Sequence, residues 1–223
     1  MSDRYPGSKV EIKGVAARHY DFFMNIVTFG RYPSFIEKSI QLMGIKPQDR
    51  IVDFGAGTGR NARLMLKYLS KKGELSGIDI SGVMISQFKK KCSHFDNAKI
   101  INRRIDEPLP FRNEFDKVFI SFVLHGFPQD VREIIMDNAF KALKNGGEFY
   151  ILDWNEFDLK ILPFYQRTFF KLMECPYAFD FIQRDWKQIM ANHNFGGFKE
   201  HFFFKGYVRL LKAKAEKVYS SGE

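Results

Sequence analysis

The sequence predicts an α/β protein built around a doubly wound, mostly parallel sheet. Short apolar runs alternate with amphipathic stretches over 46–155, which is the order of repeated strand–helix units. The run at 115–122 is apolar on both faces, as a buried parallel strand requires. A chain of 223 residues suits one sizeable domain of this kind. We therefore expect a single domain over 1–223, with an N-terminal helical cap (1–45), a ligand-binding core (46–155), and an aromatic-rich segment with a closing hairpin (156–223).

The N-terminal part is expected to be an arm followed by two helices. Residues 1–13 are polar and aperiodic, which predicts a loose arm. Residues 15–29 have the apolar spacing of a helix. Pro33 suits the first turn of a second helix over 34–43, and Gly44 suits its end.

The core is expected to alternate strands with helices. The predicted strands lie at 51–54, 74–80, 98–101, 115–122 and 148–154. The predicted helices lie at 60–71, from a Ser81 cap to about residue 94, and at 129–144, before Asn145-Gly146-Gly147.

The pattern changes after the fifth strand. The chain continues as a Phe-rich helix, a connection and another helix, at 159–173, 176–181 and 184–194. Residues 198–204 and 207–212 then predict two closing antiparallel strands around Lys205-Gly206. The expected sheet therefore has seven strands, with an antiparallel last strand.

The stretch 51–61 indicates a ligand site. Its apolar strand contains Asp53 and is followed by three glycines at alternate positions, Gly55, Gly57 and Gly59. Glycine allows a positive φ and lets a ligand lie against the backbone, and the helix that follows offers unpaired N–H groups. Dinucleotide sites use the spacing G-x-G-x-x-G and hold a pyrophosphate. Asp53 would repel a pyrophosphate and attract an ammonium group, so we expect a ligand with a positive amine.

Asp79 is the second candidate in this site. It ends the second predicted strand, 24 positions beyond Gly55, where an acid accepts hydrogen bonds from ribose hydroxyls. The alternative interpretation is a strand-end acid that caps a turn.

At these residues the chain resembles the class I S-adenosylmethionine-dependent methyltransferases. Residues 53–59 and Asp79 resemble the first two motifs of that family. Residues 106–111 resemble its adenine-binding acidic loop, 115–121 its fourth strand, and 143–147 the turn before its fifth strand. The resemblance covers about 50–155 and implies a Rossmann-like fold, methyl transfer from S-adenosylmethionine, and S-adenosylhomocysteine as the product.

The resemblance also implies roles for the residues that surround the methionine part and the ribose of the donor. Gly55, Gly57 and the nearby backbone would pack on the methionine part. Asp53 would act on its amino group, directly or through a water. Asp79 would hold the ribose.

The remaining donor contacts come from three loops. The family places an acid or its neighbouring backbone at the adenine edge; Ile105 occupies that place here, and Asp106 follows it. The main-chain carbonyls of Ser121 or Phe122 would face the amino group. The complete set of donor-binding candidates is Asp53, Gly55, Ala56, Gly57, Gly59, Asp79, Ile80, Ile105, Asp106, Ser121, Phe122 and Tyr20.

The N-terminal helix narrows the resemblance. Residues 17–25 and 29–31 are similar to the opening of the ubiquinone/menaquinone biosynthesis C-methyltransferases, with one extra residue between Tyr-Asp and Met-Asn. After the fifth strand the chain carries Asp153-Trp154-Asn155, where that subfamily shows Glu-x-Ser. A relative with its own small-molecule or lipid/quinone-like acceptor is therefore expected. Tyr20 is either a lid over the donor or a core residue.

The acceptor side has one candidate for catalysis. His125 follows the fourth predicted strand, at the edge where α/β folds bind ligands, and is interpreted as a base or substrate contact. Its alternative is a structural histidine. Trp154, Phe164 and Tyr165 are candidates for the pocket wall, against the alternative that the Phe-rich segment only covers the sheet.

Several other chemistries are disfavoured. The loop after residue 121 has no Asp/Asn-Pro-Pro-Tyr motif of amino-methylating DNA enzymes and no nucleophilic Cys of base C5 methylation. Neither grouped acids nor cysteines at metal spacing occur there, so no metal is expected. The net charge of +9 alone supports the alternative of an RNA (tRNA or rRNA) methyltransferase. A non-catalytic donor-binding regulatory protein is the alternative from another class.

The location follows from what the sequence lacks. No apolar run reaches the length of a membrane span and residues 1–6 carry no signal-peptide core. A cytoplasmic protein is therefore expected, and peripheral membrane contact is compatible with it. The sequence leaves the oligomeric state open.

Overall fold

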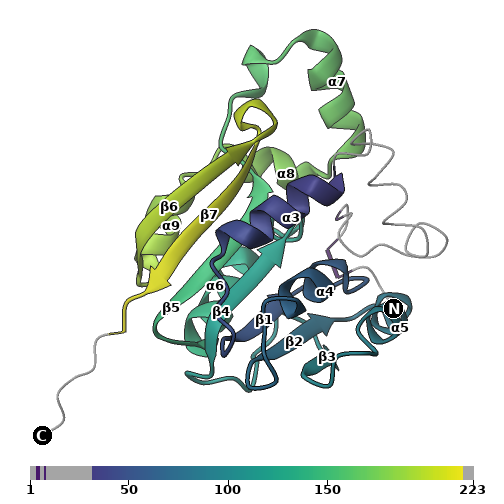
Figure 1. Ribbon diagram of the computed structural model, residues 1–223. Helices are drawn as coiled ribbons and strands as arrows, with labels where there is room; N and C mark the ends of the chain where they lie inside the picture. The colour runs from purple at the N-terminus through teal and green to yellow at the C-terminus, as the bar shows by residue number, and fades with distance from the viewer. Residues whose placement is uncertain (1–3, 6–7, 9–31, 218–223) are drawn as a thin grey trace, which may run out of the picture.

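A seven-stranded sheet forms the centre of the computed structural model, which describes residues 4, 5, 8 and 32–217 (Figure 1). The strands run in the order β3-β2-β1-β4-β5-β7-β6. Their bounds are Arg50–Phe54 (β1), Glu74–Asp79 (β2), Ala98–Asn102 (β3), Phe115–Ser121 (β4), Leu143–Trp154 (β5), Phe195–Phe203 (β6) and Val208–Ala215 (β7). Strands β1 to β5 pair in parallel, and β7 is antiparallel to both β5 and β6. The predicted fold with an antiparallel last strand is confirmed.

The order of the strands reverses next to β1. The chain runs outward from β1 to β2 and β3, and then returns to place β4 on the other side of β1. Ligands of open α/β sheets bind at this kind of switch point, outside the carboxyl ends of the strands. Asp53 lies at the carboxyl end of β1, and Ser121 lies at the carboxyl end of β4. Both strands therefore lead into loops at this switch point.

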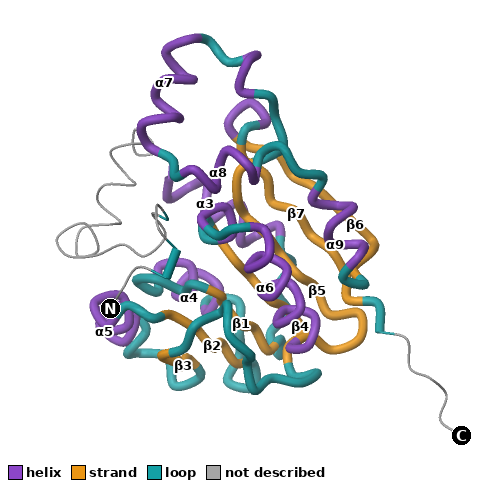
Figure 2. Tube along the Cα trace, turned by 180° about the vertical axis from the view of Figure 1, so that it is seen from behind, coloured by secondary structure: helices purple, strands orange, loops and turns teal. Residues whose placement is uncertain are grey.

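Helices cover both faces of the sheet. One face packs against α3 (Tyr32–Leu42), α4 (Arg60–Leu66) and α5 (Gly82–Lys91). The other face packs against α6 (Gln129–Ala142), α8 (Pro176–Phe181) and α9 (Trp186–Asn192), as the view from behind in Figure 2 shows. Large side chains such as Phe119 and Trp186 are fully buried in these layers, each worth about 1.5–3 kcal/mol of transfer free energy.

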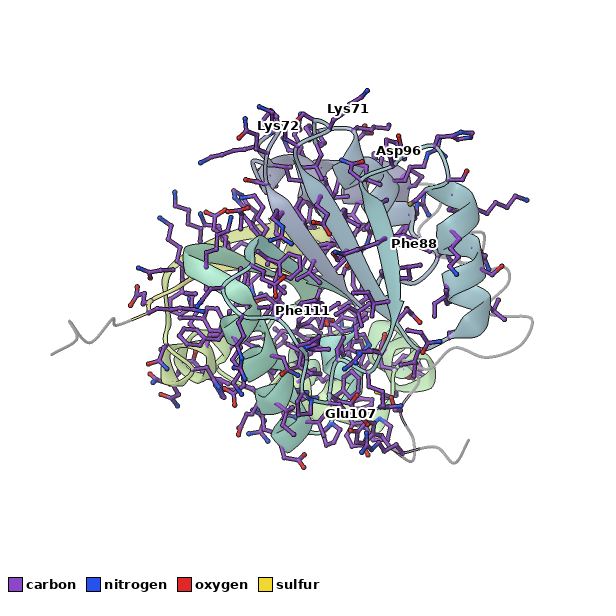
Figure 3. The ribbon with its side chains drawn as sticks, turned by 90° about the horizontal axis from the view of Figure 1, so that it is seen from below. Lys71, Lys72, Phe88, Asp96, Glu107 and Phe111 are labelled. Carbon is purple, nitrogen blue, oxygen red and sulfur yellow. The ribbon has the colours of Figure 1, made fainter. Side chains whose placement is uncertain are left out.

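The helix α5 shows why the pattern of the sequence selects this packing. Phe88 points from α5 toward the sheet and is buried (Figure 3). In contrast, Lys71 and Lys72 lie on the turn between α4 and β2 and are exposed. Ser81 caps the helix, because its side chain accepts a hydrogen bond from the Met84 N–H. Three lysines close its last turn, where cations suit the helix dipole.

Some predicted boundaries were wrong. Helix α4 ends at Leu66, five residues early, because the Ser70 N–H bonds the Pro47 carbonyl and draws the chain away. The segment 159–173 is split into a 3₁₀ turn (η2, Leu159–Ile161) and α7 (Phe164–Met173), because Pro163 cannot continue a helix from within. The expected connection at 176–181 is the helix α8, with Pro176 in its first turn.

The expectation of a loose N-terminal arm is wrong at the residues that the structure describes there. The Tyr5 hydroxyl donates to the Asp106 carboxylate, and the Tyr5 ring packs edge-on against Phe127 with centroids 5.4 Å apart. The Ser8 hydroxyl donates to the Gly126 carbonyl at 2.8 Å. These residues therefore touch the loops after β3 and β4.

Other expectations are not tested. The predicted helix over 15–29 lies outside the described residues. The division of the chain at residues 45 and 155 stays a prediction. In the ranges that the structure describes, no helix is both long and apolar enough to cross a bilayer.

Candidate functional site

The glycine loop after β1 is fixed to the neighbouring strand β2. The N–H groups of Gly55 and Ala56 both donate to the Ile78 carbonyl, at 2.9 and 3.0 Å. The N–H of Gly57 donates to the Asp79 carboxylate at 2.8 Å. All three glycines have a positive φ, between 54° and 78°, which explains why side-chain-bearing residues are disfavoured there. The loop is therefore held in place by the protein itself.

The three glycines differ in what surrounds them. A Cβ at Gly55 would lie 2.7 Å from Val123, and one at Gly59 would lie 2.8 Å from Phe88. A Cβ at Gly57 meets nothing nearer than the Gly55 carbonyl oxygen at 3.9 Å. Gly55 and Gly59 thus allow close packing within the protein, whereas Gly57 leaves the backbone open to a ligand.

Asp79 serves as a cap for two loops. Its carboxylate accepts hydrogen bonds from the Gly57 N–H and from the Ser81 N–H, each at 2.8 Å. Burial raises the pKa of Asp79, and these backbone N–H groups oppose the shift. Asp79 therefore caps a turn, as the alternative interpretation expected. Each of its carboxylate oxygens also keeps a second lone pair, which can accept a hydrogen bond from a ligand hydroxyl. Ile80, the next candidate, is half-buried beside it.

Asp53 is a buried acid at the start of the site. The residue is 1% exposed, and its Oδ2 atom has no hydrogen-bond partner among the described residues. Burial, together with the negative charge of Asp79, raises the pKa of Asp53 to about 8. A buried, unpaired carboxylate is costly, so a cationic partner would be favoured. This arrangement fits a ligand ammonium group, as the sequence predicted.

The loop after β3 is held by partners that the sequence did not reveal. Asp106 accepts from Tyr5 and from Arg104 Nε, the latter at 2.9 Å. The Ile105 carbonyl accepts from Asn138 Nδ2 at 2.9 Å, and the Ile105 side chain is buried. The Asp106 side chain is thereby engaged within the protein, and adenine recognition by this loop stays a prediction.

A strained residue follows directly after β4. Phe122 has φ of 52°, in the left-handed region that bulky side chains rarely adopt. Such strain clusters at functional sites. Ser121, just before it, accepts a hydrogen bond from Asn61 Nδ2 at 3.1 Å, which ties β4 to the helix after the glycine loop. Ala56, the remaining loop candidate, is buried.

His125 lies in the 3₁₀ turn after β4 (η1, Leu124–Gly126), between two carboxylates. Its Nδ1 is 2.7 Å from Asp153 Oδ1, and its Nε2 is 3.4 Å from Glu174 Oε2. Burial lowers the pKa of His125, but Asp153, through its charge and hydrogen bond, and Glu174 outweigh this effect and raise the pKa above its ordinary value. The Asp153 contact favours the tautomer with the proton on Nδ1, so a proton that the neutral ring gains is taken up at Nε2, the nitrogen that faces Glu174.

Sequence reasoning missed Glu174 and Arg132. Glu174 is a single acid after a Phe-rich helix, with no motif to mark it. Arg132 is fully buried and donates to the carbonyls of Leu124 and His125 at 3.2 and 3.1 Å. It also pairs with Asp180 at 2.6 Å. A buried Arg that satisfies loop carbonyls holds the His125 turn in place.

Trp154 lies at the carboxyl end of β5. Its ring contacts Phe122 and Phe170, with centroids 6.4 and 5.2 Å away. Its indole Nε1 is buried and has no hydrogen-bond partner in the described part of the chain. The structure does not bring Phe164 to this group, since that side chain is 79% exposed. The Tyr165 side chain and all of Tyr20 lie outside what the structure describes.

Known proteins that are similar to this chain include methyltransferases. Residues 51–147 match the family model described as a methyltransferase domain. The demethylmenaquinone methyltransferase of Staphylococcus aureus strain JH9 is 27% identical over 158 residues, which cover 70% of this chain. The match spans 64% of the length of that relative.

Solved structures show the same fold at low identity. A putative O-methyltransferase from Nostoc punctiforme PCC 73102 superposes with a TM-score of 0.67 and 18% identity, over 81% of this chain and 56% of that one. A SAM-dependent methyltransferase from Aquifex aeolicus superposes with a TM-score of 0.58 and 16% identity, over 81% of this chain and 89% of that one.

Proposed function

We propose that this S-adenosylmethionine-dependent methyltransferase methylates a small, apolar, oxygen-bearing acceptor at the carboxyl ends of β1, β4 and β5. The observation that carries this proposal is Asp53, whose buried carboxylate has an oxygen without a partner among the described residues, on the strand that leads into a glycine loop with open backbone at Gly57. A nicotinamide or flavin site would place a pyrophosphate against such a loop, where this carboxylate would oppose it.

Three residues would hold the donor. Asp53 would pair with the amino group, Gly57 would let the methionine part lie against the main chain, and Asp79 would accept hydrogen bonds from the ribose. When bound, S-adenosylmethionine supplies a methyl group made electrophilic by a positively charged sulfur. The chain then has to position the acceptor and exclude water.

His125 would act as the base on the acceptor side. Asp153 orients the ring by accepting a hydrogen bond from Nδ1–H, so that Nε2 would take the proton of an acidic hydroxyl or carbon acid. Because Asp153 and Glu174 raise the pKa of His125, the neutral form that can accept a proton gains population only above the ordinary histidine range. Activity is therefore expected to rise with pH through that raised pKa.

Trp154 supports an acceptor that carries an oxygen. A buried N–H without a partner costs about 1–3 kcal/mol, so it needs an explanation. A carbonyl or hydroxyl oxygen of the acceptor would accept this hydrogen bond, while Phe122 and Phe170 would pack on its apolar part. A quinone-like or phenolic compound satisfies both requirements, and the likeness to a demethylmenaquinone methyltransferase supports the same class.

The test is transfer of a tritiated methyl group. The chain is incubated with labelled S-adenosylmethionine and, separately, the lipid-soluble and RNA fractions of a cell extract. We expect label in an apolar lipid-soluble product, and its loss in His125→Gln with donor binding retained. Label in RNA would support the RNA alternative and contradict the proposed acceptor. Donor binding with no transfer to either fraction would favour a non-catalytic regulator.

A further inference from the structure

Four large apolar side chains are exposed at one end of the molecule, above the carboxyl end of β5. They come from η2, the first turn of α7, the end of β6 and the turn η3 (Phe204–Gly206), which gather at the top of Figure 1 and again at the top of Figure 2. Their exposed fractions are 72% (Ile161), 79% (Phe164), 55% (Phe202) and 40% (Phe204). We propose that this apex surface docks the protein on an anionic membrane.

The two segments that carry the apex surface are tied together below it. The Phe157 and Tyr207 rings meet edge-on with centroids 5.2 Å apart. Asn155 donates from its backbone N–H to the Tyr207 carbonyl and from its side chain to the Gly206 carbonyl, both at 2.9 Å. The four exposed residues therefore belong to one supported structure. Exposed apolar side chains that gather at one end of a protein indicate contact with an apolar partner.

The backbone of the hairpin turn is unusual at Phe204, one of these four positions, and at the residue after it. Phe204 and Lys205 are consecutive non-glycine residues with φ of 50° and 59°. This left-handed conformation is unfavourable for side-chain-bearing residues and is found where function selects it. The result is a turn that presents a phenylalanine beside a lysine.

The charge around the apex surface favours anionic lipid. Lys160 and Lys205 are exposed and form no ion pair among the described residues. The acid in this segment, Asp158, uses its side chain to accept from the Lys160 N–H. Glu200 on β6 is already paired with Arg209 and Lys187. Apolar side chains rimmed by unpaired cations match the interface of an anionic bilayer.

The form of the surface favours a lipid rather than a protein partner. Its apolar side chains stand on two turns, a helix start and the end of a strand, which form short projections rather than one broad face. Fluid lipid accepts such projections without a matching surface, whereas protein interfaces need complementary packing over a broad area. Trp154 and His125 lie below this end of the sheet, so docking would bring an apolar acceptor near them. The delivery of an acceptor to Trp154 and His125 rests on the proposed function, whereas the docking on the membrane does not.

The experiment is cosedimentation of the full chain with vesicles. One set contains phosphatidylcholine with phosphatidylglycerol, and the other contains phosphatidylcholine alone. The variant Ile161→Ser/Phe164→Ser removes the two most exposed apolar side chains, and Lys160→Gln/Lys205→Gln removes charge. The matched control is Ile134→Ser, on α6, where the side chain is 43% exposed and lies outside the apex surface.

We expect wild type and Ile134→Ser to bind the anionic vesicles equally. The apolar double variant should bind about tenfold or more weakly, because about 1.4 kcal/mol already corresponds to tenfold. The lysine double variant should lose its preference for phosphatidylglycerol. Wild type that stays in the supernatant at every lipid concentration, or an apolar double variant that binds like wild type, would overturn the proposal. The affinity for S-adenosylhomocysteine, measured by calorimetry, should be equal in wild type and all variants. This measurement distinguishes a loss of membrane binding from a loss of the donor site.

Discussion

The substitution Asp53→Asn tests the donor site through opposite effects on binding and stability. Asparagine keeps the shape of the side chain and removes the charge. The pKa of Asp53 is about 8 without ligand, so at pH 7 about ten molecules are protonated for each ionised one. A ligand ammonium group requires the ionised form, and binding must therefore release close to one proton at pH 7.

The pH dependence of donor affinity follows from this. Below pH 7, the ionised fraction of Asp53 increases nearly tenfold for each unit by which the pH is raised. The affinity of wild type for the donor should increase with pH in the same way. In Asp53→Asn the slope should disappear. A hydrogen bond to a charged group is worth about 1.5–3 kcal/mol, so at pH 7.5, after the cost of ionising Asp53, we expect roughly tenfold weaker binding in the variant.

Stability should change in the other direction. The folded-state pKa of Asp53 is raised from 3.8 to about 8, so its contribution to stability is full below pH 4 and is lost as the pH rises to 8. The loss is at most about 1.4 kcal/mol per pH unit. Asp53→Asn should therefore gain stability over wild type between pH 5 and pH 8, by up to several kcal/mol.

The assays are calorimetric titration with S-adenosylhomocysteine between pH 6 and 7.5, in buffers of different ionisation enthalpy, and urea unfolding at pH 5 and pH 8. The same pH slope of affinity in wild type and Asp53→Asn would refute the reasoning, as would binding without proton release. If the unfolding free energy of wild type and of Asp53→Asn changed equally between pH 5 and pH 8, Asp53 would be ionised in the ligand-free protein.

Three further substitutions test the other parts of the site. Gly57→Ala and Gly59→Ala both strain a positive φ by about 1 kcal/mol, but only the Cβ at Gly59 would clash, at 2.8 Å from Phe88. We therefore expect a larger loss of Tm for Gly59→Ala and weaker donor binding for Gly57→Ala. Equal Tm losses would count against this. His125→Gln should lower kcat by about 10²–10⁴ with donor Kd unchanged, and Glu174→Gln should move the midpoint of the kcat–pH profile to lower pH because Glu174 raises the pKa of His125; an unmoved midpoint would exclude that contact in solution. Trp154→Phe should raise the acceptor KM several-fold without lowering Tm, since the lost N–H has no protein partner; an unchanged KM would show that the N–H does not meet the acceptor.

The sequence was sufficient for the sheet because its signals are local. Apolar runs such as Ile51-Val52 and glycines with a positive φ report on the backbone around themselves, and they identified the core strands and the loop at Gly57. The Ser81 cap was likewise predictable from one residue and its neighbours. Such short-range signals survive without knowledge of tertiary contacts.

The acceptor side was only partly predictable because its contacts join distant segments. His125 could be placed after β4, but Glu174 lies 49 positions later and reaches it only because α7 folds back. Arg132 has no motif to mark it in the sequence, yet it is buried beneath the His125 turn. Tyr5 was assigned to a loose arm, and its contact with Asp106 spans 101 positions. No periodicity or motif reports such pairs.

The most direct test of the donor site is a crystal structure with S-adenosylhomocysteine bound. We predict its amino group within hydrogen-bond distance of Asp53 Oδ2, its methionine part against Gly57, and its ribose hydroxyls on Asp79. A product bound elsewhere, or an amino group that leaves Asp53 Oδ2 without a partner, would contradict the account.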